Sequence, residues 1–138
     1  MRRGLCIFVM VFASLALSIA QCANRPRNVS ADQAKNLLLE ALPLKTRHLP
    51  KFGLDGGLAP DRPRFYFFSA TWAGFPNGSA VIGNYAVDAS TGDVFSTTVE
   101  CEEISTPSLR KLQAEIRKRI GLSDSEYHKI KSKGPLCQ

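Results

Sequence analysis

Arg64–Gly74 reads RFYFFSATWAG and Ser79–Asp88 reads SAVIGNYAVD, and these two stretches decide the fold. Their aromatic and β-branched side chains alternate between two sides, which is typical of strands buried on at least one face. The turn signal Phe75-Pro76-Asn77-Gly78 lies between them, so the strands are expected to form an antiparallel hairpin. Ala89-Ser90-Thr91-Gly92 is a second turn, and Asp93–Glu103 is expected to form a third strand. The sequence therefore predicts a three-stranded antiparallel meander.

A helix is predicted ahead of the strands. Ser30 and Gln33 have the spacing of a capping box, in which each side chain bonds the other residue's backbone. Apolar residues follow at helical spacing until Pro43, which ends the helix. From Lys45 to Arg64 the chain contains three prolines and three glycines, so a long loop is expected there. Such a long loop inside a small domain is often functional.

Two more helices are predicted after the strands. Thr106 can cap the first of them, Pro107 suits its first turn, and Gly121 ends it. Its apolar stripe consists of Leu109, Leu112, Ile116 and Ile120. A second capping box, Ser123 with Glu126, opens a short helix. The predicted fold class is α+β, with an N-terminal helix, the three-stranded antiparallel meander, and two C-terminal helices packed on the sheet.

Residues 1–20 have the pattern of a signal peptide. Met1-Arg2-Arg3 is a basic start, and Leu5–Ala20 is an apolar run too short to span a bilayer as a helix. Cleavage at the end of this run is favoured. Alternatively, Leu17–Cys22 resembles a bacterial lipobox, in which the signal extends to residue 21 and Cys22 carries a lipid that attaches the protein to a membrane. The protein is therefore expected to be exported, as a periplasmic or outer-envelope protein or otherwise as a secreted one.

The exported chain is expected to form one domain. Residues 21–29 contain Arg25, Pro26 and Arg27 and have little to bury, so a flexible tether is expected there. Residues 30–138 then form a single α+β domain, because two independent cores do not fit in a chain of this length. A transporter and a large multidomain enzyme are excluded for the same reason.

Three cysteines would remain after export, at positions 22, 101 and 137. Cys101 and Cys137 are expected to form a disulfide, which leaves Cys22 either acylated or free to compete for a partner. The bridge closes a loop of about 37 residues, worth about 3–4 kcal/mol in the chain-entropy model. A metal site is the rival interpretation, but no CxxC motif and no neighbouring histidine supports one. Neither a metal nor a cofactor is expected.

The sequence indicates a protein that is not an enzyme. It contains no HExxH, GxSxG or P-loop motif, so no catalytic residue is assigned. Glu100 and Glu102 are expected to share one face of the third strand, where a paired-carboxylate site for a small hydrolase is conceivable. A solvated strand end is the simpler interpretation of these two residues.

Positive charge is concentrated at the C-terminus. The whole chain has 18 Lys and Arg against 12 Asp and Glu, for a net charge of +6, and residues 106–138 contain eight of the basic and three of the acidic residues. This segment is a candidate surface for an acidic protein partner, with an ordinary solvated face, anionic lipid and cell-wall polymer as the alternatives. Nucleic acid is not expected as a partner of an exported protein. The candidate contact residues are Arg110, Lys111, Arg117 and Lys118 on the helix, with Phe75 and Asn77 in the first turn.

Asn84–Val94, with the sequence NYAVDASTGDV, resembles the strand–turn–strand of small secreted PepSY-type domains, which reads Y-x-V-D-x-x-T-G-x-V. The resemblance covers Ser30–Phe95 and implies a non-catalytic domain that inhibits or binds proteins in the cell envelope. More loosely, a small basic envelope protein with one disulfide is similar to bacterial immunity proteins that neutralise cell-wall-degrading toxins.

The predicted function is that of an exported, non-enzymatic binding protein, most concretely an envelope inhibitor or immunity factor that occludes a toxin or a cell-wall hydrolase. An envelope module that modulates or anchors another protein complex is the alternative, and a small hydrolase is less favoured. The binding surface is expected in the 45–64 loop, the Phe75–Gly78 turn or the basic C-terminal helices.

Overall fold

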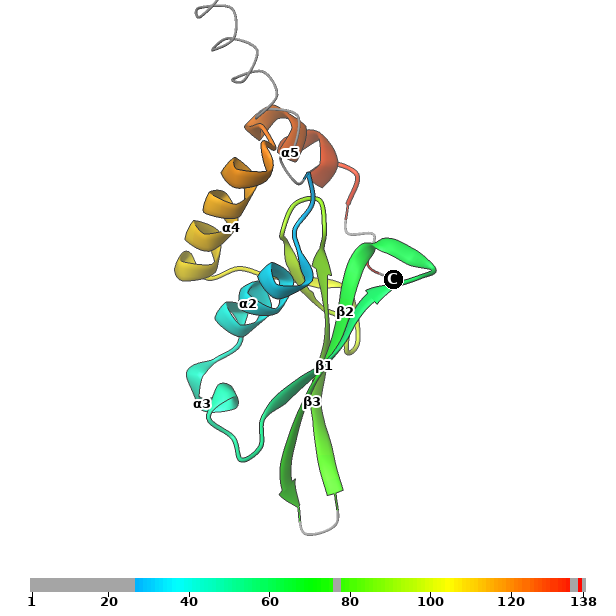
Figure 1. The fold of residues 1–138 in the computed structure, drawn as a ribbon, viewed down its shortest axis with the longest axis vertical. Coiled ribbons are helices and arrows are strands. Elements are labelled where there is room, and N and C mark those ends of the chain that lie inside the picture. The colour runs from blue at the N-terminus through cyan, green and yellow to red at the C-terminus, as the bar shows by residue number, and fades with distance from the viewer. Residues whose placement is uncertain (1–26, 76–77, 135–136, 138) are drawn as a thin grey trace, which may run out of the picture.

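The structure, a computed structural model, describes residues 27–75, 78–134 and 137 of the 138-residue chain (Figure 1). The predicted signal segment, Cys22, Asn77 and most of the predicted tether lie outside these residues. No helix in the described part is long and apolar enough to cross a membrane.

The predicted α+β class is confirmed, with more strands than expected. One antiparallel sheet has the strand order β1-β2-β3-β4-β5. Along the described chain the elements are α2 (Ala31–Ala41), α3 (Leu44–Arg47), β1 (Gly53–Ala59), β2 (Arg62–Phe75), β3 (Gly78–Asp88), β4 (Val94–Ser96), β5 (Glu102–Ile104), α4 (Pro107–Ile120) and α5 (Asp124–Lys131).

The long loop predicted for residues 45–64 is wrong, because this segment contains most of α3 and all of β1. β1 pairs with β2 from Gly53 opposite Thr71 to Leu58 opposite Tyr66. Glycine is uncommon in strands, so propensity did not predict β1. Gly56 nevertheless allows the pairing. Gly56 has a φ of 129°, and a Cβ at this position would overlap the carbonyl oxygen of Phe67.

The predicted third strand, Asp93–Glu103, is in fact two strands. β4 pairs with β3, the chain reverses through residues 97–101, and β5 pairs with β4. Thr97, Thr98 and Val99 have high strand propensity and hide the reversal. In the structure Val99 is 92% exposed. Cys101 is the last residue of this turn and is joined to Cys137 by the disulfide that the sequence predicted, with Cα atoms 6.0 Å apart.

The main core lies between the sheet and the two longer helices, α2 and α4, which cover one face of it (Figure 1). Leu37 and Leu38 of α2 and Leu109 of α4 are fully buried there against Phe68 and Val87 of the sheet. The predicted helix caps are present: both capping boxes form, Thr106 accepts a hydrogen bond from the Leu109 backbone, and Gly121 ends α4 in the left-handed conformation.

A smaller cluster lies apart from the main core. Because side chains alternate along a strand, Phe65 lies on the face of β2 opposite to Phe68, and it packs with Ala86, Phe95 and Cys137. The disulfide thus holds the C-terminus against the second face of the sheet.

Two sequence expectations need adjustment at the edges of the domain. Val29, expected in the tether, is 1% exposed in the core, and its backbone bonds Ala89 and the Tyr66 hydroxyl. The second C-terminal helix, α5, contributes no buried residue. It does not pack an apolar face on the sheet as predicted, and polar side chains attach it instead.

Candidate partner-binding site

The turn between β3 and β4, at the centre of the Asn84–Val94 motif, is rigidly built. The Asp88 carboxylate accepts hydrogen bonds from the backbone and hydroxyl of Ser90 at 2.8 and 2.6 Å, and from two nitrogens of Arg64 at 3.0 and 2.6 Å. The Gly92 backbone donates to the carbonyl of Asp88 at 2.8 Å, with Gly92 at a φ of 76°. Gln113 of α4 donates to the Gly92 carbonyl at 3.1 Å. All polar groups of Asp88 are therefore used inside the protein.

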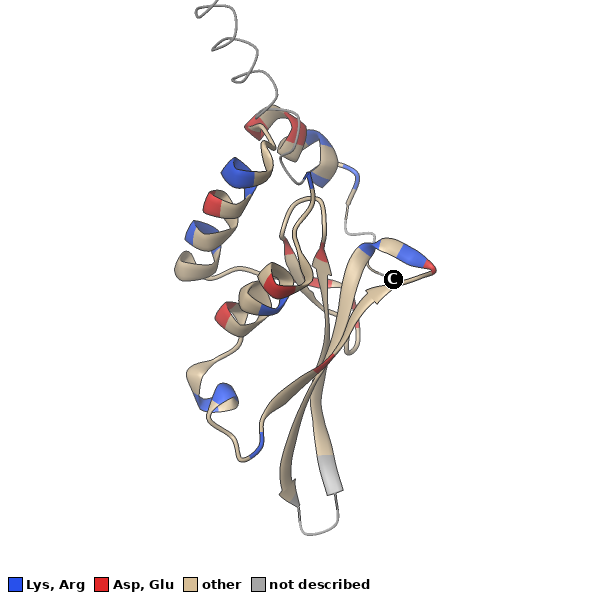
Figure 2. Cartoon of the chain, in the orientation of Figure 1, with Lys and Arg blue, Asp and Glu red and all other residues tan. Residues whose placement is uncertain are grey.

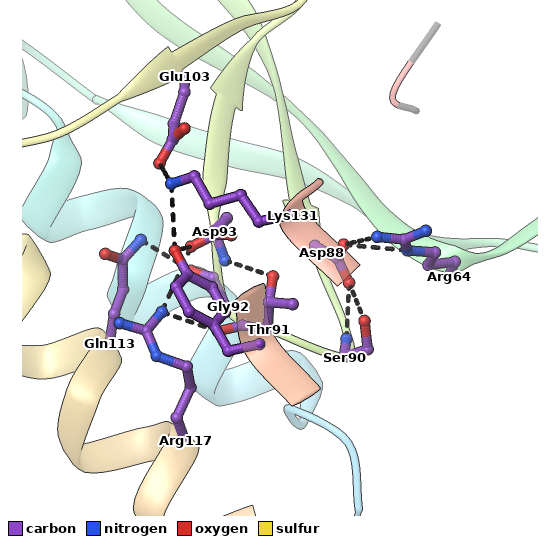
Figure 3. Close-up of polar contacts among 11 residues, drawn as sticks. Arg64, Asp88, Ser90, Thr91, Gly92, Asp93, Glu103, Gln113, Arg117 and Lys131 are labelled. Carbon is purple, nitrogen blue, oxygen red and sulfur yellow. Dashed lines mark hydrogen bonds and ion pairs between the residues drawn. The ribbon is translucent and has the colours of Figure 1, made fainter. Parts of the chain in front are cut away.

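A second group of polar contacts, centred on Asp93, joins the C-terminal helices to the sheet (Figure 3). Nη1 of Arg117 lies 3.3 Å from the Asp93 carboxylate and 3.3 Å from the Thr91 carbonyl oxygen. The Tyr127 hydroxyl donates to the same carboxylate at 3.2 Å, and the Arg117 guanidinium lies 4.1 Å from the centre of the Tyr127 ring. Lys131 donates to Tyr127 and completes the group. These five residues are called the Asp93 cluster below.

Burial sets the ionisation of the Asp93 cluster. It raises the pKa of the Asp93 carboxyl; the neighbouring cations Lys131 and Arg117 oppose this effect, and Glu103 adds to it. Burial lowers the pKa of the Lys131 ammonium. Its hydrogen bonds to Glu103 at 2.6 Å and to Tyr127 at 3.1 Å raise the pKa, and together with the nearby Asp93 they outweigh the effect of burial. The pKa of Lys131 therefore lies above its ordinary value, and Lys131 is charged at neutral pH.

A pocket beside the Asp93 cluster is small, and its charged side chains are bonded within the protein. It encloses about 110 Å³ and is lined by Arg64, Phe65, Asp88, Asp93, Phe95 and Lys131, among others. Drug-sized ligands occupy pockets of about 300–1,000 Å³. Arg64, Asp88, Asp93 and Lys131 are each engaged in an ion pair or hydrogen bonds within the protein. These contacts therefore fasten the fold.

The predicted basic residues of α4 separate into two groups. Arg117, predicted as a partner contact, has a side chain that is only 16% exposed and belongs to the Asp93 cluster. Arg110, Lys111 and Lys118 are exposed on the outer side of α4, where Figure 2 shows blue segments of the helix. Arg110 bonds the Ser105 hydroxyl at 3.0 Å. These three residues form the basic α4 face.

The remaining sequence candidates do not come together into a site. Phe75 is the last residue of β2, opposite Gly78. Glu100 lies in the turn after β4 and Glu102 lies in β5, so they do not share a strand as expected; both are exposed. Glu103, which the sequence did not single out as a site residue, forms an ion pair with Lys131. Among the described residues, no group of three or more His, Cys, Asp or Glu is placed to hold a metal ion.

Comparison with known proteins gives one informative match. No family model matches the sequence, so the PepSY resemblance gains no support, and no curated protein matches it. Among solved structures, the fold is similar to a chain in the "Structure of a type VI secretion system effector-immunity complex from Pseudomonas protegens". The two chains are 26% identical with a TM-score of 0.62, and the match covers 84% of this chain and 96% of that chain. A match over 84% of the chain is longer than the Ser30–Phe95 segment, so it includes residues outside that segment.

Proposed function

We propose that this protein is an immunity protein that binds a secreted effector and blocks it by occlusion, without catalytic activity of its own. The observation that carries this proposal is the match, over nearly the whole of both chains, to a chain of an effector–immunity complex. Inhibition by occlusion needs an interface of about 800 Å² on each partner and no reactive residues.

The interior chemistry supports a binding role. The charged side chains near the pocket bond one another: Arg64 and Asp88 join β2 to β3, and the pairs made by Arg117 and Lys131 hold α4 and α5 against the sheet. A rigid domain loses little conformational entropy when it binds, which favours tight association. The surface, and not an internal cleft, is therefore where a partner is expected to bind.

The place of action rests on the sequence. The basic start and apolar run of residues 1–20 support export to the periplasm or outer envelope, or secretion, and the lipobox-like stretch offers attachment through Cys22. Exposed Lys and Arg residues support an acidic partner surface. Both points belong to the proposal.

The test begins with the genes beside the protein's own gene. A neighbouring gene that encodes a secreted toxin supplies the candidate effector, which is co-expressed with this protein. The toxin is directed to the periplasm of a susceptible bacterium, with the full chain or with a chain lacking residues 1–20. Growth is expected to recover with the full chain only, and the mature chain is expected to elute with the toxin in a 1:1 complex. Unchanged killing without a complex would contradict the proposal, and a stable complex with an envelope protein that is not toxic would favour the modulating or anchoring role.

A further inference from the structure

The hairpin of β2 and β3 extends beyond the rest of the sheet. β1 pairs with β2 only as far as Thr71, and β4 pairs with β3 only over Tyr85–Val87, whereas β2 and β3 continue to Phe75 opposite Gly78. In the described part of the chain, the outer hairpin is therefore a ribbon of two strands. We call residues 72–75 and 78–82 the hairpin arm. In Figure 1 it extends past α2 and α3, away from α4 and α5.

A β-bulge sets the direction of the arm. Ala70 lies opposite Gly83 and Thr71 lies opposite Val81, so Ile82 is the extra residue of β3. A bulge bends its strand and increases the local twist. Ile82 packs against the main core at the base of the arm, whereas Val81 is 61% exposed. The bulge thus separates a part of the hairpin that is anchored in the core from a part that projects into solvent.

The composition of the arm is unusual for such a position. From Phe65 to Val87 the sequence contains no Asp, Glu, Lys or Arg. Exposed strands are commonly protected from other chains by charged residues, especially lysine. A two-stranded ribbon is also only marginally stable in water by itself. An uncharged, projecting ribbon with an exposed valine is therefore expected to be covered by another molecule.

Positive charge lies beside the arm. Lys45 and Arg47 are in α3, Lys51 follows it, and the sequence between Glu40 and Asp55 contains no acidic residue. The Ala73 backbone donates to the Pro50 carbonyl at 3.0 Å, which ties this segment to the arm. Figure 2 shows the blue of α3 at the same end of the molecule as the hairpin. Leu44, at the start of α3, is 62% exposed.

We infer that this end of the molecule, made by α3, residues 48–51 and the hairpin arm, is the surface that enters the effector, and that it fits an apolar cleft with an acidic rim. Specific interfaces have apolar anchors at their centre and charged residues around them. Val81 pairs with Thr71 and so lies on the face of β3 away from the main core, whereas Leu44 belongs to α3; the two anchors would contact opposite walls of the cleft. Lys45 and Lys51 provide the rim. The inference rests on the proposed function and names the chemistry of the partner.

The basic α4 face lacks such anchors. The large apolar side chains that stand exposed among the described residues are Leu44, Leu58, Val81 and Val99, and none of them belongs to α4. Charged residues without an apolar centre change association rates and salt dependence more than affinity. The basic α4 face is therefore assigned a supporting role at most.

The test uses matched pairs of variants and the purified candidate effector. Val81→Asp places a charge on the arm, and Val99→Asp makes the same change in the exposed β4–β5 turn. Lys45→Glu with Lys51→Glu reverses the rim, and Arg110→Glu with Lys118→Glu reverses two charges on α4. Dissociation constants are measured at low and high salt, and thermal unfolding verifies the fold of each variant.

Val81→Asp is expected to weaken binding at least ~30-fold and the Lys45/Lys51 double variant about 10-fold or more at low salt, while both controls stay within about threefold of wild type. If Val81→Asp lowers the unfolding temperature, the Lys45/Lys51 variant decides the matter, because its residues are exposed. Equal binding by wild type, the Val81→Asp variant and the Lys45/Lys51 variant, or a greater loss from the α4 variant, overturns this inference alone. Absence of wild-type binding overturns the proposed function itself.

Discussion

Replacing Arg117 with methionine tests whether this residue is internal, as the structure shows, or a partner contact, as the sequence suggested. Methionine keeps an apolar stem along α4 but removes the bonds to Asp93 and to the Thr91 carbonyl, and the contact with the Tyr127 ring. Removing one member of a buried ion pair costs about 3–5 kcal/mol, because the other charge is left without its partner. The Asp93 side chain is 7% exposed but keeps its hydrogen bond from Tyr127. The expected loss of stability is therefore about 2–3 kcal/mol.

The assay is urea unfolding followed by the fluorescence of Trp72, the single tryptophan of the chain. Lys118→Met is the matched control, since Lys118 is the next residue of the same helix and is exposed; its stability should stay within ~0.5 kcal/mol of wild type. Equal stability of Arg117→Met and Lys118→Met, whether or not both fall below wild type, would refute the reasoning. The m-value should not change, because the extent of folding is the same.

Three further predictions concern β1, the disulfide and pH. Gly56→Ala should cost about 1–3 kcal/mol in urea unfolding, because its φ and the adjacent Phe67 carbonyl oppose a side chain, whereas Gly57→Ala, with open space at its Cβ, should be nearly neutral; equal effects would contradict the pairing of β1. Replacing Cys101 and Cys137 by serine should cost about 3–4 kcal/mol and remove the 2 Da mass change on reduction. Burial raises the pKa of Asp93, so the folded state holds this proton to higher pH than the unfolded state, and the stability that Asp93 contributes is lost as pH rises through the folded pKa. Between about pH 4 and pH 7, the free energy of unfolding of Asp93→Asn should therefore rise more steeply with pH, or fall less, than that of the wild-type protein.

Local sequence signals were sufficient for the helix ends and the central hairpin. The capping boxes at Ser30 and Ser123 need only residues three positions apart, and both form. The pairing of β2 with β3 follows from alternating side chains around a short turn. Such features depend on neighbours in the chain, so one sequence is enough to find them.

Features that depend on distant contacts could not be predicted in this way. β1 is a strand because Gly56 allows close approach to Phe67, a relation between segments that propensity does not contain. Arg117 lies at the edge of the apolar stripe of α4 and turns inward because Asp93 meets it there from the sheet. Gln113 on the buried side was the available signal, since a polar residue in an apolar stripe indicates a polar partner across the core.

The extent of the arm was also hidden. Its length is set by where β1 and β4 stop pairing, and those strands were the two that the sequence misjudged. The absence of charge from Phe65 to Val87 was visible in the sequence. The absence of charge indicates a binding surface only once part of this segment is known to project from the sheet.

The central claim is that this protein inhibits an effector by binding it. The most direct measurement is titration of the mature chain into the purified candidate effector, with heat and toxin activity recorded together. A 1:1 complex with a Kd of about 10 nM or lower, and complete loss of toxin activity at equimolar protein, is the predicted result. No heat of binding and full toxin activity at a tenfold excess of about 10 µM protein would contradict it.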